Sequence, residues 1–493
     1  MKDARPPRTE GINARSIAAR VLVRVWQDAA FASAALDAEI RRHPQLEPRD
    51  AGLATELVYG SLRTQGWLED RLSALSSKKR GPDDPLARAH LLMGAYSVCF
   101  LDRIPRFAAI SEAVNGVAAA SDDRVGGFAN AILRRLAEEQ AAKKPVMADA
   151  IAESAPGWLR GALRRSLGRS GAAAYLSAGP VPPPIGLCLS PGEDRAEWIE
   201  RLREAAPGAT IEPGLVSPRA ILVRGAGDVR KLPGGMVSEA GSRGGAPITD
   251  PGEAPITGLG VAPIMEPGDA PIASIGDAPR WIIQEEGAQI VALAVGARPG
   301  ERVLDACAGR GNKLWVLHHD VGPAGVVDAA DLYPAKLALL GEGARAGWAH
   351  AAMAVDWTAG TGDVPSGYDR VLVDAPCSGI GTLRRRPEIA LHRSADDLAR
   401  IGALQEEIIL RAATRARDGG RVIVAVCSVL REEAEDLVAR VSGARGAGVT
   451  LEPAPFEGEV IRAIAGDAPS LRLLPHVHGT DGYFIASFIA RHR

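Results

Sequence analysis

Residues 302–313 read Arg-Val-Leu-Asp-Ala-Cys-Ala-Gly-Arg-Gly-Asn-Lys. A short apolar run ends at an acid, Asp305, and a loop of small residues leads into a predicted helix. In an open sheet this order turns backbone amides and a helix N-terminus toward a ligand. The stretch lacks the Gly-x4-Gly-Lys-Ser/Thr pattern of a phosphate loop. It therefore leaves two ligands open, a dinucleotide and S-adenosylmethionine.

Predicted strands and helices alternate along the chain after residue 280. The strands are expected at 302–304, 325–329, 369–373 and 421–426, and the helices at 313–318, 334–346, 395–417 and 432–441. This alternation predicts a parallel, doubly wound sheet, which binds ligands beyond the carboxyl ends of its strands.

Two cysteines and an aspartate follow the last two of these strands. Asp374-Ala375-Pro376-Cys377-Ser378 closes one strand, and Val426-Cys427-Ser428 closes the next. A lone cysteine at a strand end is more often a small buried hydrophobe than a nucleophile. Two thiols and a carboxyl group at neighbouring strand ends favour a reactive site. One strand earlier, Asp331 is suited to bind a ribose diol.

Paired thiols favour methyl transfer over hydride transfer, because a nicotinamide dehydrogenase has no obvious use for them. Carbon 5 of cytosine is too weak a nucleophile to take a methyl group directly. A thiolate that adds to carbon 6 makes carbon 5 nucleophilic, and a carboxyl group near ring N3 stabilises the developing charge. A thiol with a pKa of ~8.5 is only a few per cent ionised at pH 7, so such a site must favour the thiolate.

With these motifs the block 281–493 resembles the Nop/Sun group of RNA cytosine-5 methyltransferases, with Val426 where that family has Thr. Glu432-Glu433 and the segment 479–484, Gly-Thr-Asp-Gly-Tyr-Phe, also match the family. The resemblance implies that Cys427 attacks carbon 6 and that Cys377 assists release of the product. It further implies that Asp374 contacts the base and lies near the cofactor.

The same resemblance implies that the cofactor is S-adenosyl-L-methionine. Its site would comprise Cys307, Ala308, Gly309, Arg310, Gly311, Asn312, Lys313, Asp331, Asp356 and Asp374, with Asp356 near the adenine. Arg384 and Arg385 would orient RNA; without the family they are equally a solvated basic run. The family loop usually reads Ala-Pro-Gly-Gly-Lys, whereas Arg310 and Asn312 stand here as bulkier residues in a loop that a ligand approaches closely.

The N-terminal 144 residues are predicted to be all-α. Their motifs resemble the RNA-binding antitermination factor NusB, and together with the C-terminal block they resemble the bacterial small-subunit ribosomal RNA methyltransferase B group. The matching segments are 49–60, 103–105, 112–114 and 127–135. A generic Ala-rich bundle is the alternative for this part.

Four regions are expected: a helical NusB-like domain at 1–144, a small α/β connector at 145–232, an insert at 233–279 and a Rossmann-like methyltransferase domain at 280–493. In the insert Ala-Pro recurs every eight residues, at 246, 254, 262, 270 and 278. So many prolines exclude a helix or a centrally paired strand, so we expect an extended or disordered excursion. A β-solenoid and a partner-binding strip are the alternatives.

The composition of the 493 residues limits location and partners. Lys and Arg number 58 and Asp and Glu 60, a net charge of -2, so attraction to RNA must be local. The five cysteines form no CxxC pair, and the N-terminus lacks an apolar signal segment. We expect a cytoplasmic monomer with reduced thiols, no membrane span and no metal.

These patterns predict an S-adenosylmethionine-dependent RNA methyltransferase that forms 5-methylcytosine, in 16S ribosomal RNA, through a Cys427 adduct. One alternative is the same reaction on transfer RNA. Another, from a different class, is a NusB-like RNA-binding assembly factor whose altered cofactor loop supports little catalysis.

Overall fold

The computed structural model describes residues 12–76, 81–179, 181–235, 279–341, 347–444 and 448–492. They form two compact units. The first combines the chain up to Pro182 with the segment Leu383–Ser394, and the second comprises the rest of the described chain. The octapeptide repeats lie outside the described residues.

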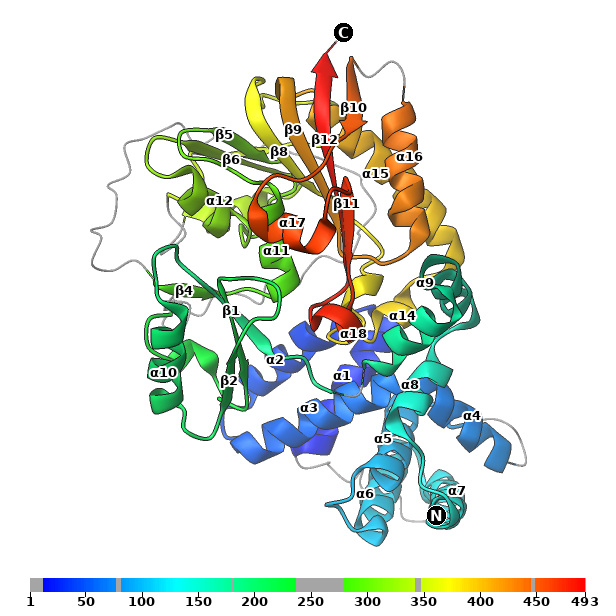
Figure 1. Ribbon diagram of the computed structural model, residues 1–493. Coiled ribbons are helices and arrows are strands. Elements are labelled where there is room, and N and C mark those ends of the chain that lie inside the picture. Colours follow the sequence, from blue (N-terminus) through cyan, green and yellow to red (C-terminus); the bar gives the residue numbers. More distant parts are fainter. Residues whose placement is uncertain are drawn as a thin grey trace. The chain divides into compact units, whose positions relative to one another are not determined.

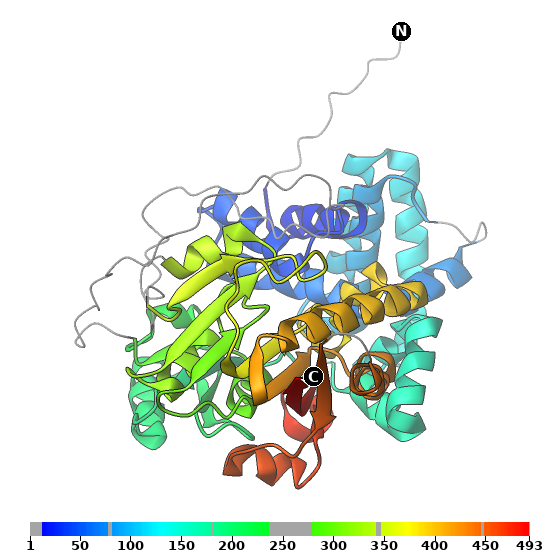
Figure 2. The ribbon, with the colours of Figure 1, turned by 90° about the horizontal axis from the view of Figure 1, so that it is seen from above.

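The first unit is helical, as predicted for residues 1–144, and it also includes helices within 147–177, in the region expected as the connector (Figure 2). Asn13 caps the first helix through a reciprocal bond pair with Ser16, and apolar faces of successive helices meet in a core that includes Leu22, Leu57 and Leu133. Across the described residues, no helix has the length and apolarity needed to cross a membrane. The helices are α1 (Ala14–Gln27), α2 (Ala32–Arg42), α3 (Pro48–Arg63), α4 (Gln65–Leu75), α5 (Pro85–Phe100), α6 (Arg106–Ala120), α7 (Asp123–Ala142), α8 (Met147–Ser154) and α9 (Gly157–Ser177).

A short segment from far along the sequence completes this helical unit. It is Leu383–Ser394, which contains α14 (Ile389–His392). Helix α2 has no side-chain cap of its own, and the buried carboxylate of Glu388 accepts a hydrogen bond from the Ala32 amide at 3.0 Å. His392 Nε2 lies 2.9 Å from the Val25 carbonyl oxygen. A negative charge at a helix N-terminus is favourable, so Glu388 stabilises the start of α2.

The second unit begins with a small antiparallel sheet of order β2-β3-β1-β4, which flanks the helix α10 (Arg195–Ala205). The strands are β1 (Ile185–Leu189), β2 (Thr210–Pro213), β3 (Ala220–Arg224) and β4 (Trp281–Ile283). Arg280 N donates to Gly234 O at 2.8 Å. The chain thus leaves and re-enters this sheet at one place, on either side of the octapeptide insert.

The large sheet has the order β10-β12-β9-β8-β5-β6-β7, with β11 paired to β12. The predicted strands are present in it as parallel strands: β5 (Arg302–Asp305), β6 (Val326–Asp331), β8 (Tyr368–Asp374) and β9 (Ala416–Val426). A further parallel strand beside β6, β7 (Ala351–Ala354), was not predicted. The expectation of a wholly parallel sheet is wrong, because β12 (Tyr483–His492) pairs antiparallel with β9, β10 (Val449–Pro453) and β11 (Ser470–Leu473).

Helices cover both faces of this sheet (Figure 1). Leu372 and Ile423 face α11 (Glu286–Ala294), α12 (Leu314–Val321) and α17 (Glu459–Ala465). Their neighbours Val371 and Val422 face α15 (Ala395–Ala413) and α16 (Glu435–Gly443). Successive strand side chains point to opposite faces, so both faces need apolar residues and the strands are continuous apolar runs.

Three predicted helices differ in detail. The helix expected at 395–417 is α15, which ends at Ala413, and β9 begins at Ala416. The helix expected at 334–346 is α13 (Pro334–Ala338), followed by a 3-10 turn; residues 342–346 lie outside the described chain. The one expected at 432–441 begins later, because Arg431–Glu433 forms a 3-10 turn before α16.

Candidate active site

The strand order reverses at β5, which lies between β6 and β8. Ligands of open sheets bind where the order reverses, beyond the carboxyl ends of the strands. Asp305, Asp331 and Asp374 are the last residues of β5, β6 and β8, and Cys427 follows β9 directly. The sheet therefore gathers the predicted site residues Asp331, Asp374 and Cys427 at one edge, together with Asp305.

The loop Cys307–Lys313 follows β5, and its shape depends on its glycine conformations and on hydrogen bonds to its backbone. Gly309 and Gly311 both have a positive φ, at 57° and 79°, which glycine adopts without strain. Gly309 N donates to Asp331 Oδ2 at 2.8 Å, and Asp331 Oδ1 accepts from Tyr333 N at 2.9 Å. The buried Trp357 indole donates to Ala306 O at 2.7 Å. Asp331 therefore fixes the backbone of this loop through its side chain.

The two bulky residues of this loop point outward. Arg310 and Asn312 are exposed, whereas Ala308 and Gly311 are buried. Asn312 has a negative φ, as Ala29 is the one non-glycine residue with a positive φ in the described chain. Gln284 Nε2 donates to Asn312 O at 3.0 Å. The departure from the family loop thus leaves the glycine conformations at 309 and 311 in place.

A lysine lies among the acids of this edge. Lys313 Nζ forms an ion pair with Asp374 Oδ2. Burial alone would lower the pKa of Lys313, but Asp374 and Asp305 outweigh it and raise that pKa. Lys313 is therefore held in its charged form and offsets the clustered carboxyl groups.

Asp305 is buried beneath the loop, and its role was missed from the sequence beyond its place at a strand end. Burial raises the pKa of Asp305 to about 7, Asp374 and Asp331 add to the rise, and Lys313 opposes it. Its Oδ1 accepts from Cys307 N at 3.3 Å. This carboxyl group thus titrates near neutrality.

The two predicted cysteines meet. Cys377 Sγ lies 3.0 Å from Cys427 Sγ. The hydrogen bond to Cys427 and burial raise the pKa of Cys377 well above its usual value, with Glu433 and Asp374 contributing. Burial likewise raises the pKa of Cys307, together with Asp305. Cys377 is therefore a protonated thiol at neutral pH, beside its partner sulfur.

A buried carboxylate below the two thiols was also missed. Glu433 accepts from Ser378 N at 2.7 Å and from Gln405 Nε2 at 3.1 Å. In the sequence Glu433 stands out only as part of the pair Glu432-Glu433, and nothing there shows which of the two acids is buried.

The remaining predicted residues divide between the two units, and Asp356 lies at the same sheet edge, since the last residue of β7, Ala354, is opposite Asp331. Asp356 follows β7, and its Oδ1 accepts from Thr358 N at 2.9 Å. Arg384 and Arg385 belong to the helical unit, where Arg63 Nη2 donates to Arg384 O at 3.0 Å. Arg384 and Arg385 therefore do not belong to the same unit as the two thiols.

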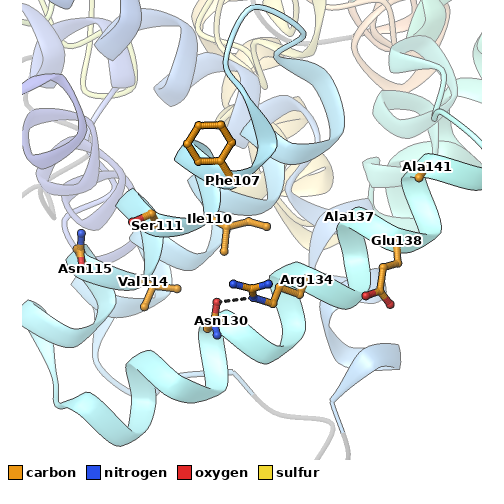
Figure 3. Close-up of a pocket in the computed structure, with 10 residues that line it drawn as sticks. All are labelled: Phe107, Ile110, Ser111, Val114, Asn115, Asn130, Arg134, Ala137, Glu138 and Ala141. Atoms are coloured by element: carbon orange, nitrogen blue, oxygen red, sulfur yellow. Dashed lines mark hydrogen bonds between the residues drawn. The ribbon is translucent and has the colours of Figure 1, made fainter.

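A separate pocket lies between α6 and α7 of the helical unit (Figure 3). Phe107, Ile110 and Val114 line it on α6, and Asn130 accepts a hydrogen bond from Arg134 at 3.0 Å on α7. It contains none of the predicted site residues. Among the described residues, no group of His, Cys, Asp or Glu is arranged to hold a metal ion.

Comparison with known proteins identifies the family. Residues 292–489 match the family described as 16S rRNA methyltransferase RsmB/F, and residues 12–138 match the NusB family. A putative methyltransferase of Mycobacterium tuberculosis, MT1451, is 30% identical over 457 residues, which cover 89% of this chain and 88% of the relative. The chain belongs to the RsmB/F methyltransferase family.

Other relatives of this RsmB/F-family enzyme match it from end to end. A probable ribosomal RNA small subunit methyltransferase B of Bacillus subtilis is 29% identical over 96% of this chain and 98% of the relative. The crystal structure of PH0851 has a TM-score of 0.68 at 19% identity and covers 98% of this chain and 100% of that one. At that identity the structural match concerns the fold alone.

Proposed function

We propose that this RsmB/F-family enzyme uses S-adenosyl-L-methionine to form 5-methylcytosine in 16S ribosomal RNA, through a covalent adduct of Cys427. The observation that carries the proposal is the pair of thiols, 3.0 Å apart, at the strand ends where Lys313 pairs with Asp374. Relatives named ribosomal RNA small subunit methyltransferase B support the substrate, and the NusB match at residues 12–138 supports an RNA partner.

The residues of the loop fit the cofactor. A Cβ built on Gly309 would meet no atom within 4 Å, so the loop has open space there. Each oxygen of Asp331 accepts one backbone amide, and a carboxylate oxygen can accept a second hydrogen bond, here from a ribose hydroxyl. Asp356 would lie on the adenine side. When bound, S-adenosylmethionine supplies an electrophilic methyl group.

The thiols and Asp374 would share the work on the base. Cys427 Sγ, as thiolate, forms a bond to carbon 6, and Asp374 stabilises the charge at ring N3. Carbon 5 would then take the methyl group, while the bond between that group and the cofactor sulfur breaks with its electron pair left on that sulfur. Cys377 Sγ, in its thiolate form, would accept the proton from carbon 5; the double bond between carbons 5 and 6 would re-form, and the bond from carbon 6 to Cys427 would break with its electron pair returning to sulfur.

The substrate cytosine must be reachable by these side chains. A base stacked in a helix is not, so the target lies in an unpaired region or is flipped out. Arg384 and Arg385 would orient the RNA by contacts with its phosphates.

The test measures methyl transfer from radiolabelled S-adenosylmethionine to 16S and transfer RNA, with bisulfite sequencing of the product. We expect one labelled cytosine in 16S RNA, no transfer by Cys427→Ala and a trapped protein–RNA adduct with Cys377→Ala. Persistent turnover by Cys427→Ala would refute the mechanism through a Cys427 adduct. Label in transfer RNA alone would show that the substrate is transfer RNA and not 16S RNA. If calorimetry shows no binding of S-adenosylmethionine at millimolar concentration, the RNA-binding assembly factor is the better interpretation.

A further inference from the structure

The loop that carries Cys377 rests on a buried carboxylate. Glu433 is fully buried, and both of its oxygens accept hydrogen bonds from Ser378, the residue after Cys377. Ser378 N donates to Oε1 at 2.7 Å, and Ser378 Oγ donates to Oε2 at 2.5 Å. Bonds to a charged acceptor are roughly twice as strong as neutral ones. One side of Cys377 is therefore firmly held.

The other side of Cys377 is held through the same carboxylate. Gln405, on α15, donates from Nε2 to Glu433 Oε1 at 3.1 Å and to the Pro376 carbonyl at 2.9 Å. Pro376 and Ser378 flank Cys377 in the chain. A single buried acid, with one amide beside it, thus fixes both neighbours of the thiol.

The second thiol is connected to the same group. Ser378 Oγ and Ser428 Oγ lie 3.3 Å apart, and Ser428 follows Cys427 directly. Gly381 N, from the Cys377 loop, donates to Cys427 O at 2.9 Å. The positions of the two sulfur atoms therefore depend on one hydrogen-bonded cluster, with Glu433 at its centre.

We propose that Glu433 is a positioning residue that sets Cys377 against Cys427 for release of the methylated product. The inference rests on the proposed function, because only that function includes a step in which Cys377 assists release of the product from Cys427. A buried carboxylate is costly unless it is fully hydrogen-bonded, and donors of Ser378 and Gln405 meet that need here. A reacting group displaced by about 1 Å can lose about a hundredfold in rate.

The negative charge of Glu433 gives a second readout that a purely structural anchor would not give. After the Cys427 hydrogen bond and burial, Glu433 is among the causes that raise the pKa of Cys377. Removing that charge lowers the pKa of the thiol. The pH at which product release accelerates should therefore move downward in a neutral variant.

The test compares Glu433→Gln and Ser378→Ala with wild type and with Glu435→Gln as a matched control. Glu435 is exposed and pairs with Arg472 at the surface. On 16S RNA that wild type methylates, we expect Glu433→Gln to lower kcat about ten- to hundredfold with KM within about twofold. Protein–RNA adduct should accumulate on denaturing gels as it does for Cys377→Ala, and the release profile should shift to lower pH.

The outcomes separate the two proposals. No methylation by wild type refutes the proposed function, whereas a Glu433→Gln variant that matches Glu435→Gln refutes the positioning role alone. A loss of activity without adduct or pH shift, with a lowered melting temperature, also overturns it, because the residue would then be structural. If Glu433→Gln does not fold, Ser378→Ala decides: it keeps the amide bond to Glu433, and wild-type release by it overturns the proposal.

Discussion

The cofactor loop and the cysteine loops meet at one sheet edge but keep their shapes by different means. The loop 306–313 is held by glycine conformations and by hydrogen bonds of Asp331 and Trp357 to its backbone, and its own bulky side chains are exposed. The loops after β8 and β9 are held by buried side chains, with Ser378 hydrogen-bonded to both Glu433 and Ser428. We therefore expect the first loop to tolerate the departures from the family pattern at Arg310 and Asn312 and the second to tolerate few.

The largest expected effect comes from adding a methyl group at Gly381. Its Cβ would lie 1.9 Å from Gly482 O and 2.7 Å from Cys427 O, which are backbone atoms that cannot move aside. Gly381→Ala should cost about 3 kcal/mol of stability and abolish methyl transfer. At Gly309, where φ is 57° and nothing lies within 4 Å, alanine should cost only about 1 kcal/mol. Thermal unfolding and methyl-transfer assays on both variants measure this difference. Equal losses of stability and activity in the two variants would contradict it.

The next effect concerns pH and the buried Asp305. Its pKa is raised by burial to about 7, so the folded state favours the protonated form. The stability that this provides is complete below pH ~4 and is lost as the pH rises through about 7. Relative to Asp305→Asn, wild type should therefore lose about 2 kcal/mol between pH 5 and 7, since each pKa unit corresponds to ~1.4 kcal/mol. Urea unfolding at several pH values checks this, and parallel curves would contradict it.

A smaller effect is expected beneath the cofactor loop. Trp357→Phe removes the indole donor to Ala306 O and leaves a buried carbonyl without that bond. The free energy of unfolding should fall by about 1.5 kcal/mol. Cofactor affinity should fall with it, because Ala306 begins the loop. Calorimetric titration with S-adenosylmethionine, beside unfolding curves, tests whether the two losses go together; an unchanged affinity would show that the loop holds its shape without Trp357.

The smallest effect is expected where the chain departs from its family. Asn312→Gly restores the usual glycine, but Asn312 is exposed and needs no positive φ. Surface substitutions change free energies by about 0.5 kcal/mol at most, so the affinity for S-adenosylmethionine should change no more than about twofold. A tenfold gain in titration would mean that the departure does weaken the loop.

Much of the catalytic unit follows from the sequence, because apolar runs such as Val422–Ala425 mark strands buried on both faces, and an acid or cysteine marks where each ends. The antiparallel strands could not be placed in the same way. The partner of β12 depends on contacts between residues some 60 apart, such as Phe484 and Val426. Asp305 and Glu433 were missed as site residues for a related reason: burial turns an ordinary acid into a titrating or anchoring one, and burial is a property of the folded chain.

The way Glu388 and His392 complete the helical unit also bears on how the protein is made. Residues near Val25 and Ala32 leave the ribosome more than 350 residues before their partners do. The first helices must therefore persist through most of synthesis without these bonds. A fragment that ends at Pro182 would lack them permanently, so the N-terminal helices are best expressed together with the segment Leu383–Ser394.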